Sequence, residues 1–447
     1  MEKKVSRLGL LTLSIGGMVG WGAFMQPGLK FLPEAGVLST MVAMLIGVIM
    51  VSTIAACYGI ILNKSPNSTG GEYSYSKLAF ARKHTFVVGW FLLIVFIGIA
   101  ALNTTSFALI FKNVLYPDTD FIQLYQVAGY PVTLGEALIS VLVILIFSWF
   151  MLKGVTAVVH VQNVVTVALI IIVFSIFFFG LGKMDFTTAP LNVHFGQGQI
   201  KLSEIISILV ITPWAYYGVS NIPKVASEAK LPYKEVIFLT VLSLVCGFFI
   251  YQILLVLTAS SFSRADLQGY NGWATGEAIR NLFGTPGLFL VTSGLAFAIF
   301  SGVNSFFMGA TRVMYSMSED GLLPPRFSLK HKKYDTPYHA IGFILIIIAA
   351  TPFFGRQVIG WIVGMAALGG AIIFFYTSWT AFKISQGWER IVGLMATIFS
   401  SIFILLLVIP TSPGFLSNES IVALVVWSIL GLVLYKMNSE GRSSYGK

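Results

Sequence analysis

Twelve apolar runs that contain no Asp, Glu, Lys or Arg divide the chain into long hydrophobic segments separated by short polar ones. An apolar helix of about 17–25 residues spans a bilayer, whereas a spanning β-strand has about ten residues that alternate between apolar and polar. These runs are apolar on every side, so they predict membrane-spanning helices and exclude a β-barrel. The predicted spans are residues 8–29, 37–62, 85–111, 137–152, 154–182, 205–223, 236–263, 281–311, 340–355, 357–382, 391–418 and 420–435.

Composition and charge agree with a membrane protein. Charged residues make up 10% of the chain, against about 25% in soluble domains, and apolar residues make up 56%. If the N-terminus is cytoplasmic, 21 of the 28 Lys and Arg residues lie inside and 7 outside. Because positive loops stay on the cytoplasmic side, we expect a multi-pass protein of the cell membrane with both termini cytoplasmic. The net charge of +10 then reflects contact with anionic lipids of the bilayer, and no nucleic-acid partner is required.

Two of the runs are interrupted at matching places. The first contains Gly16, Gly17, Gly20 and Gly22 and closes with Pro27, and the sixth contains the segment 213–218, which begins with proline and ends with glycine. Interrupted helices in corresponding positions of two halves are typical of secondary transporters, where exposed backbone groups hold substrate and ion. Five helices per half predict a five-plus-five inverted repeat. The domains are then residues 1–182 (first repeat), 183–386 (second repeat) and 387–447 (two further helices and a cytoplasmic tail).

Four ordered motifs resemble those of the amino acid/polyamine/organocation transporters. They are residues 15–24 with 27–28, residues 70–75, Glu228 with Pro232, and residues 312–315 with 319–324. The resemblance covers about residues 8–390. It implies an all-α integral membrane protein of the leucine-transporter type with twelve transmembrane helices, and substrates that are amino acids or related amines.

Two positions depart from the family pattern. Trp21 stands between two glycines where family members carry a small residue, so its indole either fills part of the pocket or points into packing. Leu169 stands where some proton-driven members carry a lysine, a few residues after a Gln-Asn pair. A proton mechanism based on that lysine is therefore in doubt.

Backbone at the two breaks suits both ends of an amino acid. The half-helix after the first break offers free N–H groups and a positive dipole end to the carboxylate, and the carbonyls left over suit the ammonium. By resemblance, Trp214 would cover the substrate. The predicted substrate-binding residues are Met18, Gly20, Trp21, Gly22, Trp214, Ala215, Tyr216 and Gly218. Alternatively, the glycines permit close helix packing, and the aromatic residues are interfacial anchors.

The resemblance also suggests an ion site and an inner gate. The candidate ligands of a coupling sodium ion are Gly16, Val19, Ser301 and Ser305, because an oxygen-only set suits a hard cation. Sodium is favoured modestly, and proton coupling and exchange remain alternatives. Ion pairs among Glu228, Arg312, Glu319 and Asp320 are the gate candidates, with solvated loop charges as the alternative. No cofactor and no other metal are expected.

Together these features predict a carrier rather than an enzyme. The pocket helices contain no Asp or Glu well inside the membrane, and an uncompensated buried charge costs at least several kcal/mol, so we expect neutral substrates. The leading hypothesis is a permease for neutral amino acids that works by alternating access with sodium or proton coupling. An exchanger and an amine or polyamine transporter are the alternatives, and a nutrient sensor is a remote one. Neither an ATP-binding loop nor a catalytic motif is present, and no obligate protein partner is indicated.

Overall fold

The computed structural model describes residues 6–66, 71–110, 122–127, 130–153, 158–187, 190–195, 198–223, 231–270, 272–355 and 357–444. Within them, nine helices are long and apolar enough to cross a membrane, and two shorter apolar helical segments span Arg7–Met18 and Tyr338–Phe354. The chain is therefore a helical multi-pass membrane protein. The twelve crossings and the inverted repeat remain predictions.

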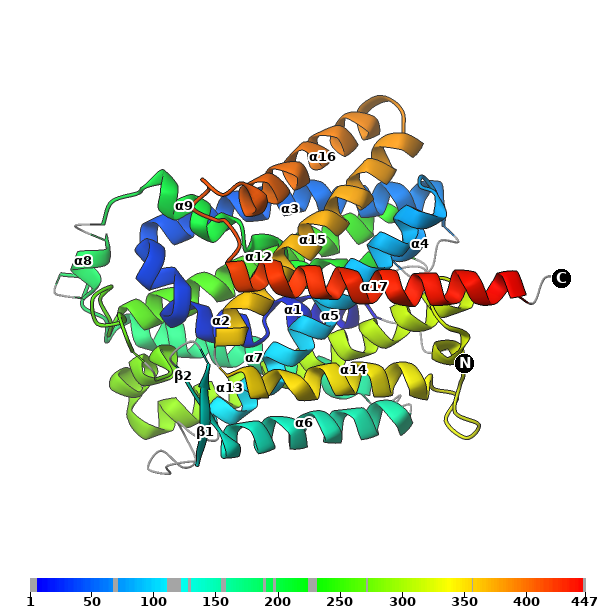
Figure 1. Cartoon of the computed structure of the whole chain (residues 1–447). Helices are drawn as coiled ribbons and strands as arrows, with labels where there is room; N and C mark the ends of the chain where they lie inside the picture. Colours follow the sequence, from blue (N-terminus) through cyan, green and yellow to red (C-terminus); the bar gives the residue numbers. More distant parts are fainter. Residues whose placement is uncertain are drawn as a thin grey trace.

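The helices follow one another with few irregular segments (Figure 1). The first part of the chain forms α1 (Arg7–Met18), α2 (Trp21–Gln26), the π-helix η1 (Pro27–Ala35), α3 (Gly36–Lys64), α4 (Glu72–Ser76), α5 (Arg82–Ile110), β1 (Gln123–Val127), β2 (Tyr130–Thr133), α6 (Leu134–Lys153) and α7 (Val158–Leu181). The second part forms α8 (Leu191–Phe195), α9 (Leu202–Leu209), α10 (Thr212–Ala215), the 3₁₀-helix η3 (Tyr217–Ser220), α12 (Tyr233–Ala259), α13 (Ala274–Glu319), η4 (Pro325–Ser328), α14 (Tyr338–Ala350), η5 (Thr351–Phe354), α15 (Gln357–Ile384), α16 (Gly387–Val408) and α17 (Asn418–Ser444).

Burial separates central helices from peripheral ones. In the most apolar stretch of α5, 89% of the residues are buried, against 28% in α6 and 22% in α17. Side chains on α6 and α17 therefore face the surroundings, where lipid would cover them, whereas α5 lies in the core. The short helix α4 lies at the end of the molecule where α17 ends, and the hairpin and α8 lie at the opposite end (Figure 1).

Three helices differ in extent from the predicted spans. Helix α13 begins at Ala274, before the expected run, and bends at Gly284, whose φ of 68° is unfavourable for other residues. Helix α16 ends at Val408 rather than at residue 418, because Pro410 cannot continue a helix. Helix α17 continues past residue 435 to Ser444. Counting uncharged residues misses these boundaries, because helices also include charged residues and end at prolines.

A two-stranded antiparallel sheet was not expected from the apolar pattern. Strand β1 pairs with β2, with Gln126 opposite Pro131 and Val127 opposite Tyr130. The Tyr125 hydroxyl donates a hydrogen bond to the Phe353 carbonyl at 2.5 Å, which ties the hairpin to η5. The hairpin therefore covers one end of the helices.

Reporter fusions test the predicted orientation. Because positive loops stay inside, green fluorescent protein fused after residue 447 is expected to fluoresce and alkaline phosphatase at the same place to be inactive. A phosphatase fusion after Pro190, between the fifth and sixth predicted spans, serves as the opposite control and is expected to be active. Active phosphatase at the C-terminus would contradict the cytoplasmic assignment.

Candidate functional site

The first predicted break is present, between Val19 and Gly20. Helix α1 ends at Met18, Val19 adopts φ −91° and ψ 66°, and α2 begins at Trp21 after an extended Gly20. The expected interruption is thus confirmed, but the second half-helix begins at Trp21, two residues earlier than a start after the Gly20-Trp21-Gly22 triplet. Pro27 does not end this half, since the chain continues as the π-helix η1.

Side chains from other helices satisfy part of the backbone that the break exposes. The Trp21 N–H donates to the Asn103 Oδ1 of α5 at 3.1 Å, and the Tyr251 hydroxyl of α12 donates to the Met18 carbonyl at 3.3 Å. A Cβ at Gly20 would lie 3.1 Å from Asn103 Oδ1, so glycine allows this close approach. Unpaired backbone groups are costly away from water, and these two contacts stabilise the interruption.

The second interrupted segment packs against the first. Helix α9 ends at Leu209, α10 ends at Ala215, and η3 begins at Tyr217. The Ser14 hydroxyl of α1 donates to the Gly218 carbonyl at 3.1 Å. A Cβ at Gly218 would lie only 2.6 Å from the Ser14 carbonyl oxygen, so this glycine permits contact between the two broken helices. Gly218 therefore lies against the α1 backbone.

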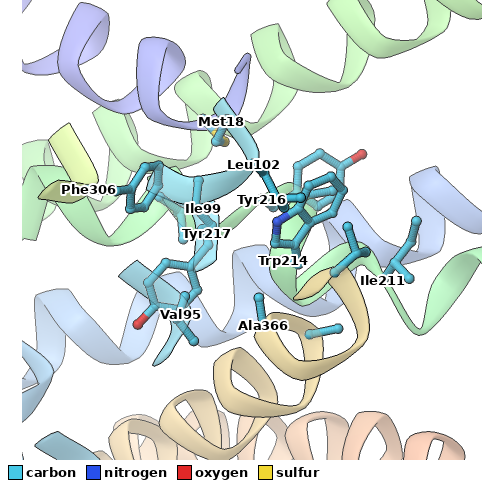
Figure 2. Packing of buried hydrophobic residues seen from close by; sticks show 14 of the residues in the cluster. Met18, Val95, Ile99, Leu102, Ile211, Trp214, Tyr216, Tyr217, Phe306 and Ala366 are labelled. Atoms are coloured by element: carbon cyan, nitrogen blue, oxygen red, sulfur yellow. The ribbon is translucent and has the colours of Figure 1, made fainter. Parts of the chain in front are cut away.

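A small cavity of about 20 Å³ lies between the breaks. Six of the eight predicted substrate-binding residues line it, namely Met18, Gly20, Trp21, Gly22, Trp214 and Ala215. Gly218 and Tyr216 do not; the Tyr216 hydroxyl instead donates to the Met44 carbonyl of α3 at 3.2 Å. The remaining lining residues are Gly17, Ile99, Leu102, Asn103 and Tyr251. Figure 2 shows Met18, Ile99, Leu102 and Trp214 gathered from three helices.

The two tryptophans shape this cavity. A Cβ at Gly22 would lie 3.1 Å from Trp214 Cζ2 and closer still to Cη2, so the indole of Trp214 rests on the first broken helix. Trp21 lines the cavity with 1% of its surface exposed, and its indole N–H has no hydrogen-bond partner among the described residues. The sequence left the place of the Trp21 side chain open; in the structure the residue lines the cavity and its side chain is buried.

Two predicted ion ligands come together, with two residues from α7 that the sequence analysis missed. A Cβ at Gly16 would overlap the Ser301 hydroxyl and lie 2.7 Å from Thr166 Oγ1 and 2.8 Å from Gln162 Nε2. The Gln162 amide donates a hydrogen bond to the Ser301 hydroxyl. The signal for α7 was available, because Gln162 and Thr166 are polar and four residues apart in an apolar run.

The other two candidate ligands are less directly placed. Ser305, one turn beyond Ser301, has a buried hydroxyl without a partner in the part of the chain that the structure describes. Val19 is fully buried, and its N–H donates to the Ile15 carbonyl at 2.7 Å.

The three inner-gate candidates that the structure describes, Arg312, Glu319 and Asp320, do not pair with one another. Asp320 forms an ion pair with Lys77 and accepts a hydrogen bond from the Tyr73 hydroxyl at 2.6 Å. Glu319 accepts a hydrogen bond from Tyr315 in the same helix. Arg312 is exposed and forms no ion pair with a described residue, and Glu228 lies outside the described residues. Asp320 is therefore held by the segment that contains α4 rather than by Arg312.

Two helices that are broken side by side around an uncharged cavity define a membrane carrier. The profile of the amino acid permease family matches residues 5–430, nearly the whole chain. The chain therefore belongs to the amino acid permease family, and the resemblance to the amino acid/polyamine/organocation transporters is confirmed.

Known proteins of similar sequence include several antiporters. The arginine/agmatine antiporter of Chlamydia felis is 26% identical over 74% of this chain and 67% of its own length. The arginine/ornithine antiporter of Pseudomonas aeruginosa is 21% identical over 76% of this chain and 69% of its own length. The large neutral amino acids transporter small subunit 2 of Oryctolagus cuniculus is 24% identical over 77% of this chain and 63% of its own length.

Substitution at Gly22 tests whether the cavity is the substrate site. The methyl group of Gly22→Ala would displace the Trp214 indole, which rests on Gly22. We therefore expect substrate affinity to fall by about tenfold or more, as measured by equilibrium binding to purified protein. Gly342→Ala in α14 is the matched control, because a Cβ there meets no atom within 4 Å. Unchanged affinity in Gly22→Ala would show that substrate binds elsewhere.

Proposed function

We propose that the protein is an amino acid antiporter that exchanges one amino acid for another across the cell membrane. The observation that carries the proposal is the cavity between the two broken helices, lined by residues of both. Helix breaks at one place expose backbone N–H and C=O groups that can bind the two ends of an amino acid. The names of the similar antiporters support exchange over ion-driven uptake.

The first broken helix provides for the substrate carboxylate. Gly20 lies immediately before α2, where N–H groups lack intrahelical partners and the helix dipole is positive. In the structure, the Asn103 amide oxygen accepts one of these hydrogen bonds, from Trp21. A bound carboxylate would accept hydrogen bonds from the N–H groups of this turn. The hydrogen bond from the Trp21 N–H to Asn103 would either remain or be replaced by one to the carboxylate.

Exchange needs no coupling ion, whereas sodium-driven uptake would need oxygen ligands directed toward the ion. Beside Gly16 the Gln162 amide donates a hydrogen bond to the Ser301 hydroxyl, and Thr166 Oγ1 has no partner among the described residues. Sodium and proton coupling are outcomes that the transport test below distinguishes from exchange.

The lining of the cavity favours substrates with neutral side chains. Its eleven described residues include no Asp, Glu, Lys or Arg. A cationic side chain would lose its water without gaining a countercharge, which costs at least several kcal/mol in protein interiors, an order-of-magnitude figure. Exchange of cationic amino acids, as the names of the similar antiporters state for those proteins, is the competing outcome.

Proteoliposomes loaded with unlabelled amino acid test the proposal. We expect labelled neutral amino acids to enter loaded vesicles at least about tenfold faster than empty ones, because an antiporter returns across the membrane only with substrate bound. Replacing sodium by choline or collapsing a pH gradient should leave the rate unchanged. Uptake into empty vesicles that requires sodium or a pH gradient would contradict exchange, and stronger competition by arginine than by leucine would contradict the neutral preference.

Replacement of Trp21 tests whether its indole limits substrate size. Because Trp21 lines the cavity and its side chain is buried, Trp21→Ser is expected to enlarge the cavity and to shift preference toward bulkier neutral amino acids, measured as the ratio of tryptophan to alanine exchange. Phe307→Ser, at a fully buried aromatic residue outside the cavity lining, is the control for loss of packing alone. An unchanged ratio in Trp21→Ser would show that the indole does not determine size.

A further inference from the structure

A buried carboxyl group that the proposed transport cycle does not use lies at the start of α4. Glu72 has 1% of its surface exposed, and its Oε1 accepts hydrogen bonds from two tyrosines. The Tyr58 hydroxyl, from the end of α3, donates at 3.0 Å. The Tyr217 hydroxyl, from η3 of the second broken helix, donates at 3.3 Å. Both tyrosines are fully buried.

Tyr217 connects this carboxyl group to the cavity. It comes two residues after Ala215, which lines the cavity. Its ring stacks on Phe374 of α15, with centroids 5.6 Å apart and planes at 20°, and meets Phe96 of α5 edge-on at 5.9 Å. A ring held on several sides has little freedom, so the hydrogen bond to Glu72 helps to set where η3 lies.

Helix α4 also contacts the second broken helix at another point and the end of α13. The Tyr75 hydroxyl donates to the Pro223 carbonyl at 3.4 Å. On the other side of α4, Tyr73 and Lys77 bind the Asp320 carboxylate. Helix α4 and the Lys77 that follows it thus join the second broken helix to the end of α13. These contacts lie at the end of the molecule that is predicted to face the cytoplasm.

A carboxyl acceptor suits this place for a physical reason. Removing it takes the acceptor away from the Tyr58 hydroxyl and one partner away from the Tyr217 hydroxyl, and the loss of a buried hydrogen bond is costly. Burial of the carboxyl group is in turn tolerable because the two tyrosines donate hydrogen bonds to its Oε1. The contacts of Glu72 therefore favour the closed arrangement seen here over one in which η3 moves away from α4.

We propose that Glu72 is a positioning residue for transport, which holds the second broken helix closed on the predicted cytoplasmic side through Tyr217. The proposal rests on the proposed transport function, since the cycle requires that this side open. When this side opens, the hydrogen bond between Tyr217 and Glu72 is released. The hydrogen bond from Tyr58 is retained, because Tyr58 belongs to α3, the helix that precedes α4 in the chain.

Cysteine labelling separates this role from simple packing. Val219 lies in η3 beyond Tyr217 and is fully buried, so Val219→Cys in a background with Cys57→Ala and Cys246→Ala reports opening toward the predicted cytoplasmic side. In purified protein without substrate, we expect Tyr217→Phe to raise the labelling rate by about tenfold, because one bond to a carboxylate is lost. Tyr58→Phe, which loses the other bond to the same oxygen, is the matched control and should change the rate by less than about twofold.

Two further variants and a transport assay complete the test. Glu72→Gln keeps an acceptor oxygen and should label close to the wild-type rate, whereas Glu72→Leu should label at least as fast as Tyr217→Phe. The exchange rate in proteoliposomes should fall in Tyr217→Phe, with the melting temperature unchanged relative to Tyr58→Phe. Equal labelling of the two tyrosine variants would overturn the proposal. The labelling experiment needs no substrate. If the wild-type protein fails to exchange amino acids, the proposed function is contradicted, but the labelling rates still test the role of Glu72.

Discussion

The requirement that backbone polar groups find partners inside an apolar protein governs this structure. Helix α1 stops at Met18, and the groups released there meet Asn103 from α5 and Tyr251 from α12. Without such partners an interrupted helix in a membrane would be strongly disfavoured. The position of the break therefore depends on helices distant in sequence, and the cavity exists because the backbone there does not continue as a helix.

Contact between the two breaks depends on small residues at specific points. Gly218 lets η3 approach the α1 backbone, and Gly22 provides the seat of Trp214. Hydrogen bonds from Ser14 and Asn221 join the two segments further. Because closely packed atoms transmit displacement, a movement of the backbone at one break displaces the backbone at the other. This geometry gives a single small cavity two sets of backbone groups, as recognition of both ends of an amino acid requires.

The buried polar side chains divide the protein into regions with different roles. Around Gly16 they are uncharged and join α1, α7 and α13. Around α4 they include the Glu72 carboxyl group and several tyrosines, which join the second broken helix to α3 and, through Asp320, to α13. The cavity is lined by uncharged residues, so charged side chains are kept away from it.

The sequence by itself determined the membrane class, the two breaks and most of the cavity lining, because these follow from local properties. Apolar length predicts helices, and glycine and proline predict interruptions; together with the family resemblance, they identified the lining residues Met18, Gly20, Trp21, Gly22, Trp214 and Ala215 without tertiary information. Only the tertiary structure decided that Tyr216 turns toward α3, that Asn103 caps the break and that Gln162 meets Ser301. It also decided that Asp320 binds Lys77 rather than Arg312, because pairing partners come from helices far apart in the chain, and their distances depend on packing.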